Sequence, residues 1–233
     1  MEESQPSRRR PQGPRAASPA GTALELVVGA ALAGLATLAG MAFVHRPWPN
    51  RLDVWGYRLL PADPAARWAQ HLATLGSLRV LVVGVIAVFV IGLFTDWVRA
   101  AACAAAPVMA VLIVQDLAKP LVDRHIGLTG ASSYPSGTVA AVAALATALT
   151  LVMPVRVRPL LALVGAVATV GVSVAVIVLR WHYPTDVLGG MAVGVGAVLT
   201  LDALAHLPWV VAGAIHPSRN DRRVGSRRSP SLA

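Results

Sequence analysis

The sequence predicts an all-α, polytopic membrane protein built as a bundle of six transmembrane helices. Of its 233 residues, 56% are hydrophobic and only 13% are charged, whereas soluble domains carry about 25% charged residues. The hydrophobic residues also gather in six runs, each close to the roughly 20 residues that a helix needs to cross a bilayer. The predicted spans are Ala23–Val44, Leu78–Val98, Ala100–Leu117, Gly137–Met153, Pro159–Leu179 and Val187–Leu207.

Two polar tails flank the hydrophobic part of the chain. Residues 1–22 and 216–233 are rich in Arg, Pro and Ser and have no hydrophobic periodicity, so we expect disordered basic tails around one domain at 23–215. The formal net charge of +9 comes largely from these tails. Arginines that flank hydrophobic helices follow the positive-inside rule and contact anionic headgroups. We therefore expect both termini in the cytoplasm of a cell-membrane protein, and no nucleic-acid partner.

This topology sorts the connections between spans onto two sides. The short basic connections at Trp97–Arg99 and around Arg156 and Arg158 would be cytoplasmic. The connections 45–77, 118–136 and 180–186 would face outward, and they contain most of the unusual polar residues. Aromatic and charged residues alternate in 45–77, which indicates a helix lying at the membrane surface.

The third outer connection contains His182 and Asp186, four residues apart where a helix is expected to begin. Pro184 is tolerated only in a first helical turn, so it places the helix start near this point. Side chains at i and i+4 share a helix face. A carboxylate beside an imidazole fixes its tautomer and leaves the other ring nitrogen free to attack an electrophile.

The second outer connection carries cations followed by a turn of small residues. Lys119 and Arg124 are suited to bind phosphate oxygens. Ser136 and Gly137 follow Pro135 directly before a predicted helix, where free backbone N–H groups and the helix dipole favour an anion. Two outer connections therefore predict a phosphate cradle next to a nucleophile.

These residues resemble the motifs of the type 2 phosphatidic acid phosphatase superfamily of membrane lipid phosphatases. The corresponding segments are Lys119-Pro-Leu-Val-Asp-Arg124, Pro135-Ser-Gly-Thr138, and Val176 through His182 to Asp186. The resemblance implies that His182 attacks phosphorus to form a phosphohistidine and that Asp186 orients it. It implies further that no metal or other cofactor is needed, and that the phosphoryl oxygens are held by Lys119, Arg124, Ser136 and Gly137.

The chain departs from the family pattern at three places. Thr138 stands where the family has the histidine that protonates the leaving group, and Val176 stands where it has an arginine. Arg180, nearly one helical turn later, is a candidate replacement for that arginine. The first motif continues as His125-Ile126 where the family commonly has Arg-Pro, and His125 is a candidate source of the missing proton.

The leading hypothesis is an outward-facing phosphatase acting on a phospholipid or polyprenyl phosphate or pyrophosphate, with Thr138 also in the substrate site. The alternative is an impaired family member that binds or moves a phosphorylated lipid without hydrolysing it, which Thr138 favours. An ion channel or transporter is disfavoured, because the polar residues gather at one face and do not continue across the spans.

Overall fold

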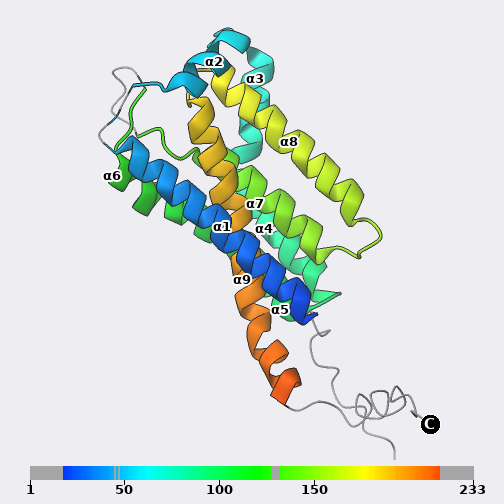
Figure 1. The fold of residues 1–233 in the computed structure, drawn as a ribbon. Coiled ribbons are helices and arrows are strands. Elements are labelled where there is room, and N and C mark those ends of the chain that lie inside the picture. The colour runs from blue at the N-terminus through cyan, green and yellow to red at the C-terminus, as the bar shows by residue number, and fades with distance from the viewer. Residues whose placement is uncertain (1–17, 45, 47, 127–131, 216–233) are drawn as a thin grey trace, which may run out of the picture.

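The computed structural model describes residues 18–44, 46, 48–126 and 132–215, and in these ranges the chain is helical, with one isolated bridge between His125 and Ser132. Figure 1 shows the long helices packed as a bundle with short helices at one end. In chain order the elements are α1 (Pro19–Phe43), α2 (Arg51–Leu59), α3 (Arg67–Ala73), the 3-10 helix η1 (Thr74–Gly76), α4 (Leu78–Leu93), α5 (Trp97–Leu112), the π-helix η2 (Ile113–Ala118), α6 (Lys119–Val122), α7 (Gly137–Val152), α8 (Arg158–Val178) and α9 (Pro184–Ile215).

Several of these helices are long and hydrophobic enough to cross a membrane, which confirms a multi-pass all-α membrane protein. Four continuous stretches qualify: Pro19–Phe43, Trp97–Val122, Arg158–Val178 and Pro184–Ala212. A fifth qualifies if Arg67–Gly76 and Leu78–Leu93, bent by 45° at their junction, form one span. The remaining predicted span, Gly137–Met153, corresponds to α7, which is apolar but has only 16 residues. The predicted count of six spans is therefore not confirmed.

Two predicted boundaries are wrong, in each case because a polar residue caps a helix. Asp96 accepts hydrogen bonds from the backbone N–H groups of Val98 (2.9 Å) and Arg99 (3.3 Å), so α5 begins at Trp97. The predicted connection Trp97–Arg99 is thus the first turn of a helix, and the turn lies at residues 94–96. Ser18 likewise caps α1, so residues 19–22 are helical and not part of a disordered tail. Residues 1–17 and 216–233 of the predicted tails lie outside the described residues.

Helix α9 lies at the centre of the bundle and packs against α1, α5 and α7. Small residues allow these close approaches. A Cβ added to Gly190 or Gly194 of α9 would collide with the carbonyl oxygens of Ser136 and Ala140. On the other side of α9, a Cβ on Gly29 of α1 would lie 2.9 Å from the backbone nitrogen of Thr200.

The two ends of the bundle differ in content. Helix α1 begins and α9 ends at one end, whereas α2, α3 and the α8–α9 connection lie at the other (Figure 1). At the first end, Arg99 of α5 pairs with Asp202 of α9 at 2.7 Å and approaches Glu25 of α1 at 3.9 Å. We refer below to the opposite end as the α2 end.

A fully buried arginine ties the α2 end together. The Arg124 guanidinium donates from Nη2 to Asp53 of α2 (2.6 Å) and from Nη1 to Asp186 of α9 (2.7 Å). Asp53 also accepts from the backbone N–H of Thr185 (3.0 Å) and from its hydroxyl (2.8 Å). Its second role is in a capping box with Asn50 at the start of α2. One ion cluster therefore joins α2, the segment after α6 and the start of α9.

Two aromatic rings enclose the same guanidinium. Its carbon lies 4.2 Å from the centroid of the Phe43 ring and 4.4 Å from that of Tyr183. Cation–π contacts of this kind contribute about 2 kcal/mol when they are desolvated. Loss of one partner of such a buried pair leaves an uncompensated charge and costs about 3–5 kcal/mol.

We expect Asp53→Asn to lower the free energy of unfolding by about 3 kcal/mol, because the buried guanidinium keeps only one carboxylate. Thermal unfolding of the purified protein in detergent measures this as a fall of roughly 5–10 °C in Tm. Asp63→Asn is the matched control, since Asp63 is an exposed carboxylate on the chain just after α2. Equal changes in Tm for the two variants would contradict a stabilising role for the Asp53–Arg124 pair.

Candidate active site

The candidate site lies at the α2 end, where α6, α7 and α9 meet. The connection between α8 and α9 turns sharply at Arg180, whose φ of 59° is in the left-handed region. Helix α9 then starts at Pro184, which confirms the helix start predicted from that proline. His182 lies in this connection and is only 8% exposed.

The ring of His182 is held in one tautomer by a backbone carbonyl. Its Nδ1 lies 2.9 Å from the carbonyl oxygen of Ser133. A carbonyl oxygen can only accept, so Nδ1 carries the proton and Nε2 keeps its lone pair. The carbonyl of His182 accepts in turn from the Tyr57 hydroxyl at 3.2 Å, so α2 also holds the backbone of this residue. The arrangement presents Nε2 as a neutral nucleophile.

Electrostatics keep this imidazole neutral. Burial, with the nearby positive charge of Lys119 as the second cause, lowers the pKa of His182 to about 4. The ring is therefore uncharged at neutral pH and available for attack. Among the sequence-predicted cations, Lys119 is the one whose charge acts on His182.

Asp186 supports the site in a different way from the expected one. Its Oδ2 is 3.9 Å from Nδ1 of His182, beyond hydrogen-bond distance. That oxygen accepts instead from the backbone N–H of Tyr183 (2.9 Å), and Oδ1 accepts from Arg124. The carbonyl of Asp186 also accepts from the backbone N–H of Ser136 at 2.9 Å. Asp186 thus fixes the connection that carries His182 and links it to the start of α7.

The start of α7 forms a cradle for an anion. Ser136 is the N-cap, and its hydroxyl oxygen accepts from the backbone N–H of Val139 at 3.4 Å. The N–H groups of Gly137 and Thr138 precede that position in the first turn, where a helix supplies no acceptor. Together with the helix dipole, they favour a negatively charged ligand.

Gln115 is a residue of this cradle that the sequence analysis did not select. A Cβ on Gly137 would lie 2.8 Å from Nε2 of Gln115, so the Gln115 amide lies against the first turn of α7. Gln115 belongs to the π-helix η2, a type of irregularity often found at functional sites. Its position four residues before Lys119, and so on the same helix face, is the signal that would have found it.

The structure does not leave Arg124 open to a ligand. Both of its terminal nitrogens bond carboxylates in the buried cluster, and its side chain has no exposed surface. The expectation that Arg124 binds substrate phosphate does not fit this arrangement, because a buried guanidinium needs the carboxylates that occupy it.

Arg180 and His125 are also held by neighbours. The Arg180 guanidinium stacks 3.7 Å from the centroid of the Tyr57 ring and donates to the carbonyl of Leu60 at 3.1 Å, at the end of α2. Nε2 of His125 lies 2.8 Å from Oδ1 of Asp123 in its own segment. Neither arrangement directs these side chains to His182, so their predicted roles as a replacement arginine and a proton donor stay predictions.

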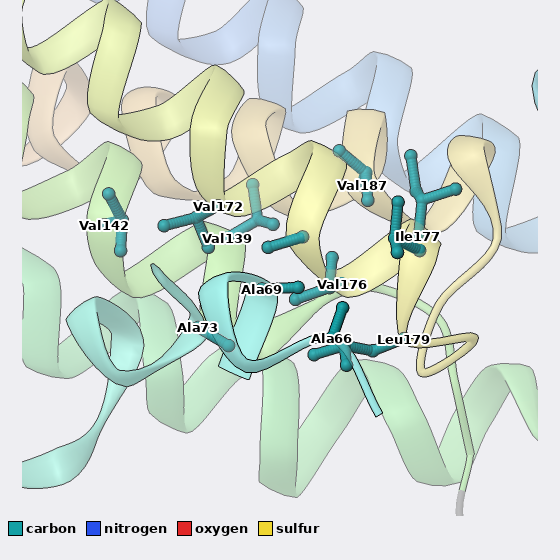
Figure 2. Packing of buried hydrophobic residues seen from close by; sticks show 12 residues of the cluster. Ala66, Ala69, Ala73, Val139, Val142, Val172, Val176, Ile177, Leu179 and Val187 are labelled. Atoms are coloured by element: carbon teal, nitrogen blue, oxygen red, sulfur yellow. The ribbon is translucent and has the colours of Figure 1, made fainter. Parts of the chain in front are cut away.

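The two other family departures sit in packed surroundings. Thr138 is half-buried, and its carbonyl oxygen would lie 2.6 Å from a Cβ on Gly76 of η1. Val176 is fully buried in a hydrophobic cluster (Figure 2), where the labelled alanines Ala66 and Ala69 lie beside it. The space at position 176 therefore suits an apolar side chain, because hydrophobic residues surround it.

A search among curated proteins gave no match. Among solved structures, the chain is similar to the crystal structure of the first transmembrane PAP2 type phosphatidylglycerolphosphate phosphatase from Bacillus subtilis, with 17% identity and a TM-score of 0.48 over 86% of this chain and 96% of that one. The family model of the PAP2 superfamily matches residues 22–206. Since this match covers most of the chain and agrees with the family predicted from the motifs, the chain belongs to the PAP2 superfamily.

Proposed function

We propose that the protein hydrolyses a lipid phosphate or diphosphate, such as a polyprenyl or phosphatidyl compound, through a phosphohistidine at His182. The observation that carries the proposal is the 2.9 Å hydrogen bond from Nδ1 of His182 to the Ser133 carbonyl, which leaves Nε2 free. Lys119 and the first turn of α7 supply positive charge and N–H donors for the phosphoryl oxygens. Phosphoryl transfer depends mostly on such positioning and charge.

The reaction proceeds in two displacements. Nε2 of His182 attacks phosphorus, the N–P bond forms, and the bond from phosphorus to the leaving oxygen breaks with its electron pair going to that oxygen. Water then attacks the phosphohistidine, the N–P bond breaks, and inorganic phosphate leaves with neutral His182 restored. The proton on Nδ1 stays on that nitrogen, hydrogen-bonded to the Ser133 carbonyl, through both steps. The protons of the attacking water leave on the phosphate, and no step needs a metal or other cofactor.

Thr138 makes a diphosphate the better substrate. Loss of general acid catalysis costs about 10²- to 10⁴-fold when the leaving group must be protonated. A lipid alcohol leaves as a strongly basic alkoxide and needs that proton. When His182 attacks the terminal phosphorus of a lipid diphosphate, the leaving group is the lipid monophosphate. The second pKa of a phosphate monoester is about 6, so this group departs without an acid.

The proposed orientation puts the site outside the cell. The α2 end carries the site, and the opposite end carries the start of α1 and the end of α9 (Figure 1). Arg99 lies at the start of α5 at that opposite end, Arg156 and Arg158 lie in the connection between α7 and α8, and the tail arginines flank α1 and α9 in the sequence. The positive-inside rule favours the cytoplasm for an end with these arginines. This orientation requires an even number of crossings, with six as the predicted number.

A second candidate function is binding or movement of a phosphorylated lipid without hydrolysis. Two observations favour it: Thr138 replaces the family's acid, and Arg124 is committed to Asp53 and Asp186. The remaining cradle and Lys119 would still hold a phosphate group.

Replacement of the nucleophile tests the mechanism. We expect purified protein to release phosphate from polyprenyl diphosphate with a chelator present, and His182→Ala to lower kcat by about 10⁴-fold or more. An acid-labile phosphoryl group should be trapped on the wild-type chain and be absent from the variant. His71→Ala is the control, since His71 is exposed on α3. Unchanged activity in His182→Ala would rule out the phosphohistidine.

The ionisation of His182 is a second prediction. Burial and Lys119 both disfavour the charged form, so the ring should titrate near pH 4 and not near the usual 6.5. Lys119→Gln removes one of the two causes and should move the midpoint upward. NMR of ring-labelled histidine measures both midpoints without substrate. A wild-type midpoint at the usual value would mean that this ring is solvated and distant from Lys119.

Substrate preference separates the two candidate functions. We expect kcat/KM for a lipid diphosphate to exceed that for the matching monophosphate by about 100-fold or more, and Thr138→His to narrow this ratio by raising the monophosphate rate. Thr150→His is the control, because Thr150 lies on the same helix far from its first turn. Binding of both lipids without turnover, in wild type and Thr138→His alike, would favour the non-hydrolytic candidate.

A further inference from the structure

A hydrophobic groove runs into the bundle between α1 and the α5–α6 segment, with α9 as its floor. Its volume is about 390 Å³. Ala33 and Met41 line it from α1, Met109 from α5, and Gly196 and Ala197 from α9. This groove has no role in the fold or the chemistry described above.

The outer end of the groove adjoins the candidate active site. Its lining there includes Ala118, Tyr134 and Pro135. These residues are the chain neighbours of Lys119, Ser133 and Ser136, which supply the cation, the carbonyl partner of His182 and the cap of α7. The groove therefore ends next to the segments that carry the candidate site.

The depth of the groove matches one leaflet of a bilayer. Its wall on α1 extends from Ala33 to Val44, which at about 1.5 Å per residue is roughly 16 Å. The hydrocarbon core of a bilayer is about 30 Å thick. A chain that starts at the headgroup level of the site would end near the midplane.

We propose that this groove seats one hydrocarbon chain of the lipid substrate whose phosphate lies between Lys119 and His182; this rests on the proposed function. The occupant is a lipid of the same leaflet, because the cation at the mouth complements a phosphate and the walls below it are apolar. Two other apolar grooves, of about 340 and 260 Å³, lie along α7 and α8 and are not lined by neighbours of Lys119 or His182 in sequence.

The groove acts by orientation. A chain gains little from leaving the bilayer for an apolar groove, since lipid tails are as apolar as the groove walls. Holding the chain instead fixes the phosphate against Nε2, and a small misplacement of a reacting group can cost about 10²-fold in rate. Filling the groove should therefore harm long-chain substrates and spare short ones.

The test uses Ala33→Phe and Ala197→Phe, which fill the groove from α1 and from α9. The substrates are a long-chain polyprenyl diphosphate in nanodiscs and a short-chain, water-soluble alkyl diphosphate. We expect each variant to lose about tenfold or more in kcat/KM for the long-chain substrate and to stay within about twofold of wild type for the short one. Ala166→Phe, which fills the groove between α7 and α8, should leave both values unchanged.

The remaining outcomes overturn the proposal in distinct ways. Equal losses for both substrates would mean that the substitutions damage the site, and no loss for either would mean that the chain lies elsewhere. If Ala166→Phe lowered kcat/KM for the long-chain substrate by the same factor, the effect would come from bundle packing in general and not from the groove.

A binding measurement separates this proposal from the proposed function. A lipid diphosphate with a photoreactive group in its chain should label the α1 and α5 peptides of the wild-type chain, and Ala33→Phe should reduce that labelling. Labelling without turnover would refute the hydrolytic function but support the groove as the binding site of the lipid chain. Equal labelling of α7 and α8 peptides would overturn the proposal that the groove binds the lipid chain, whether or not the protein is a phosphatase.

Discussion

The buried guanidinium of Arg124 is the constraint on which the α2 end of the molecule depends. Burial of this charge is tolerated because Asp53 and Asp186 bond it at 2.6 and 2.7 Å and two aromatic rings enclose it. Asp186 is thereby fixed at the start of α9, and its carbonyl holds the N-cap of α7. The relative positions of the His182 connection and the first turn of α7 follow from this ion cluster.

This use of Arg124 changes the electrostatics of the site. An arginine that neutralises two carboxylates no longer adds positive charge to a ligand, and position 176 contributes an apolar side chain in its place. In the proposed site, the positive charge then comes from Lys119, and the neutral donors are the N–H groups at the start of α7 and the neighbouring Gln115 amide. Neutral donors stabilise developing charge where water is excluded, and the same exclusion keeps His182 uncharged.

The sequence allowed the membrane class, the family and most helices to be predicted, because hydropathy and motif spacing are local. A helix start near Pro184 was predicted for the same reason, and α9 begins at that residue. The cluster around Arg124 was not predicted, since Asp53 is 71 residues away in the chain and was interpreted as part of a surface helix. Likewise the partner of His182 is a backbone carbonyl 49 residues away, and a carbonyl has no signature in a sequence.

The path of α1 explains why the hydrophobic groove ends beside the polar residues of the candidate site. At Gly29, α1 packs directly on the backbone of α9, so the two helices are in close contact in that half of the bundle. Further along, Tyr134 lies against Gly40, and its hydroxyl donates to the carbonyl of Ala36 at 2.6 Å. Tyr134 directly follows the residue that holds His182 and also lines the groove. Tyr134 thus connects the spacing of α1 with the segment that holds His182, so a change in that packing would alter the groove and the position of His182 together.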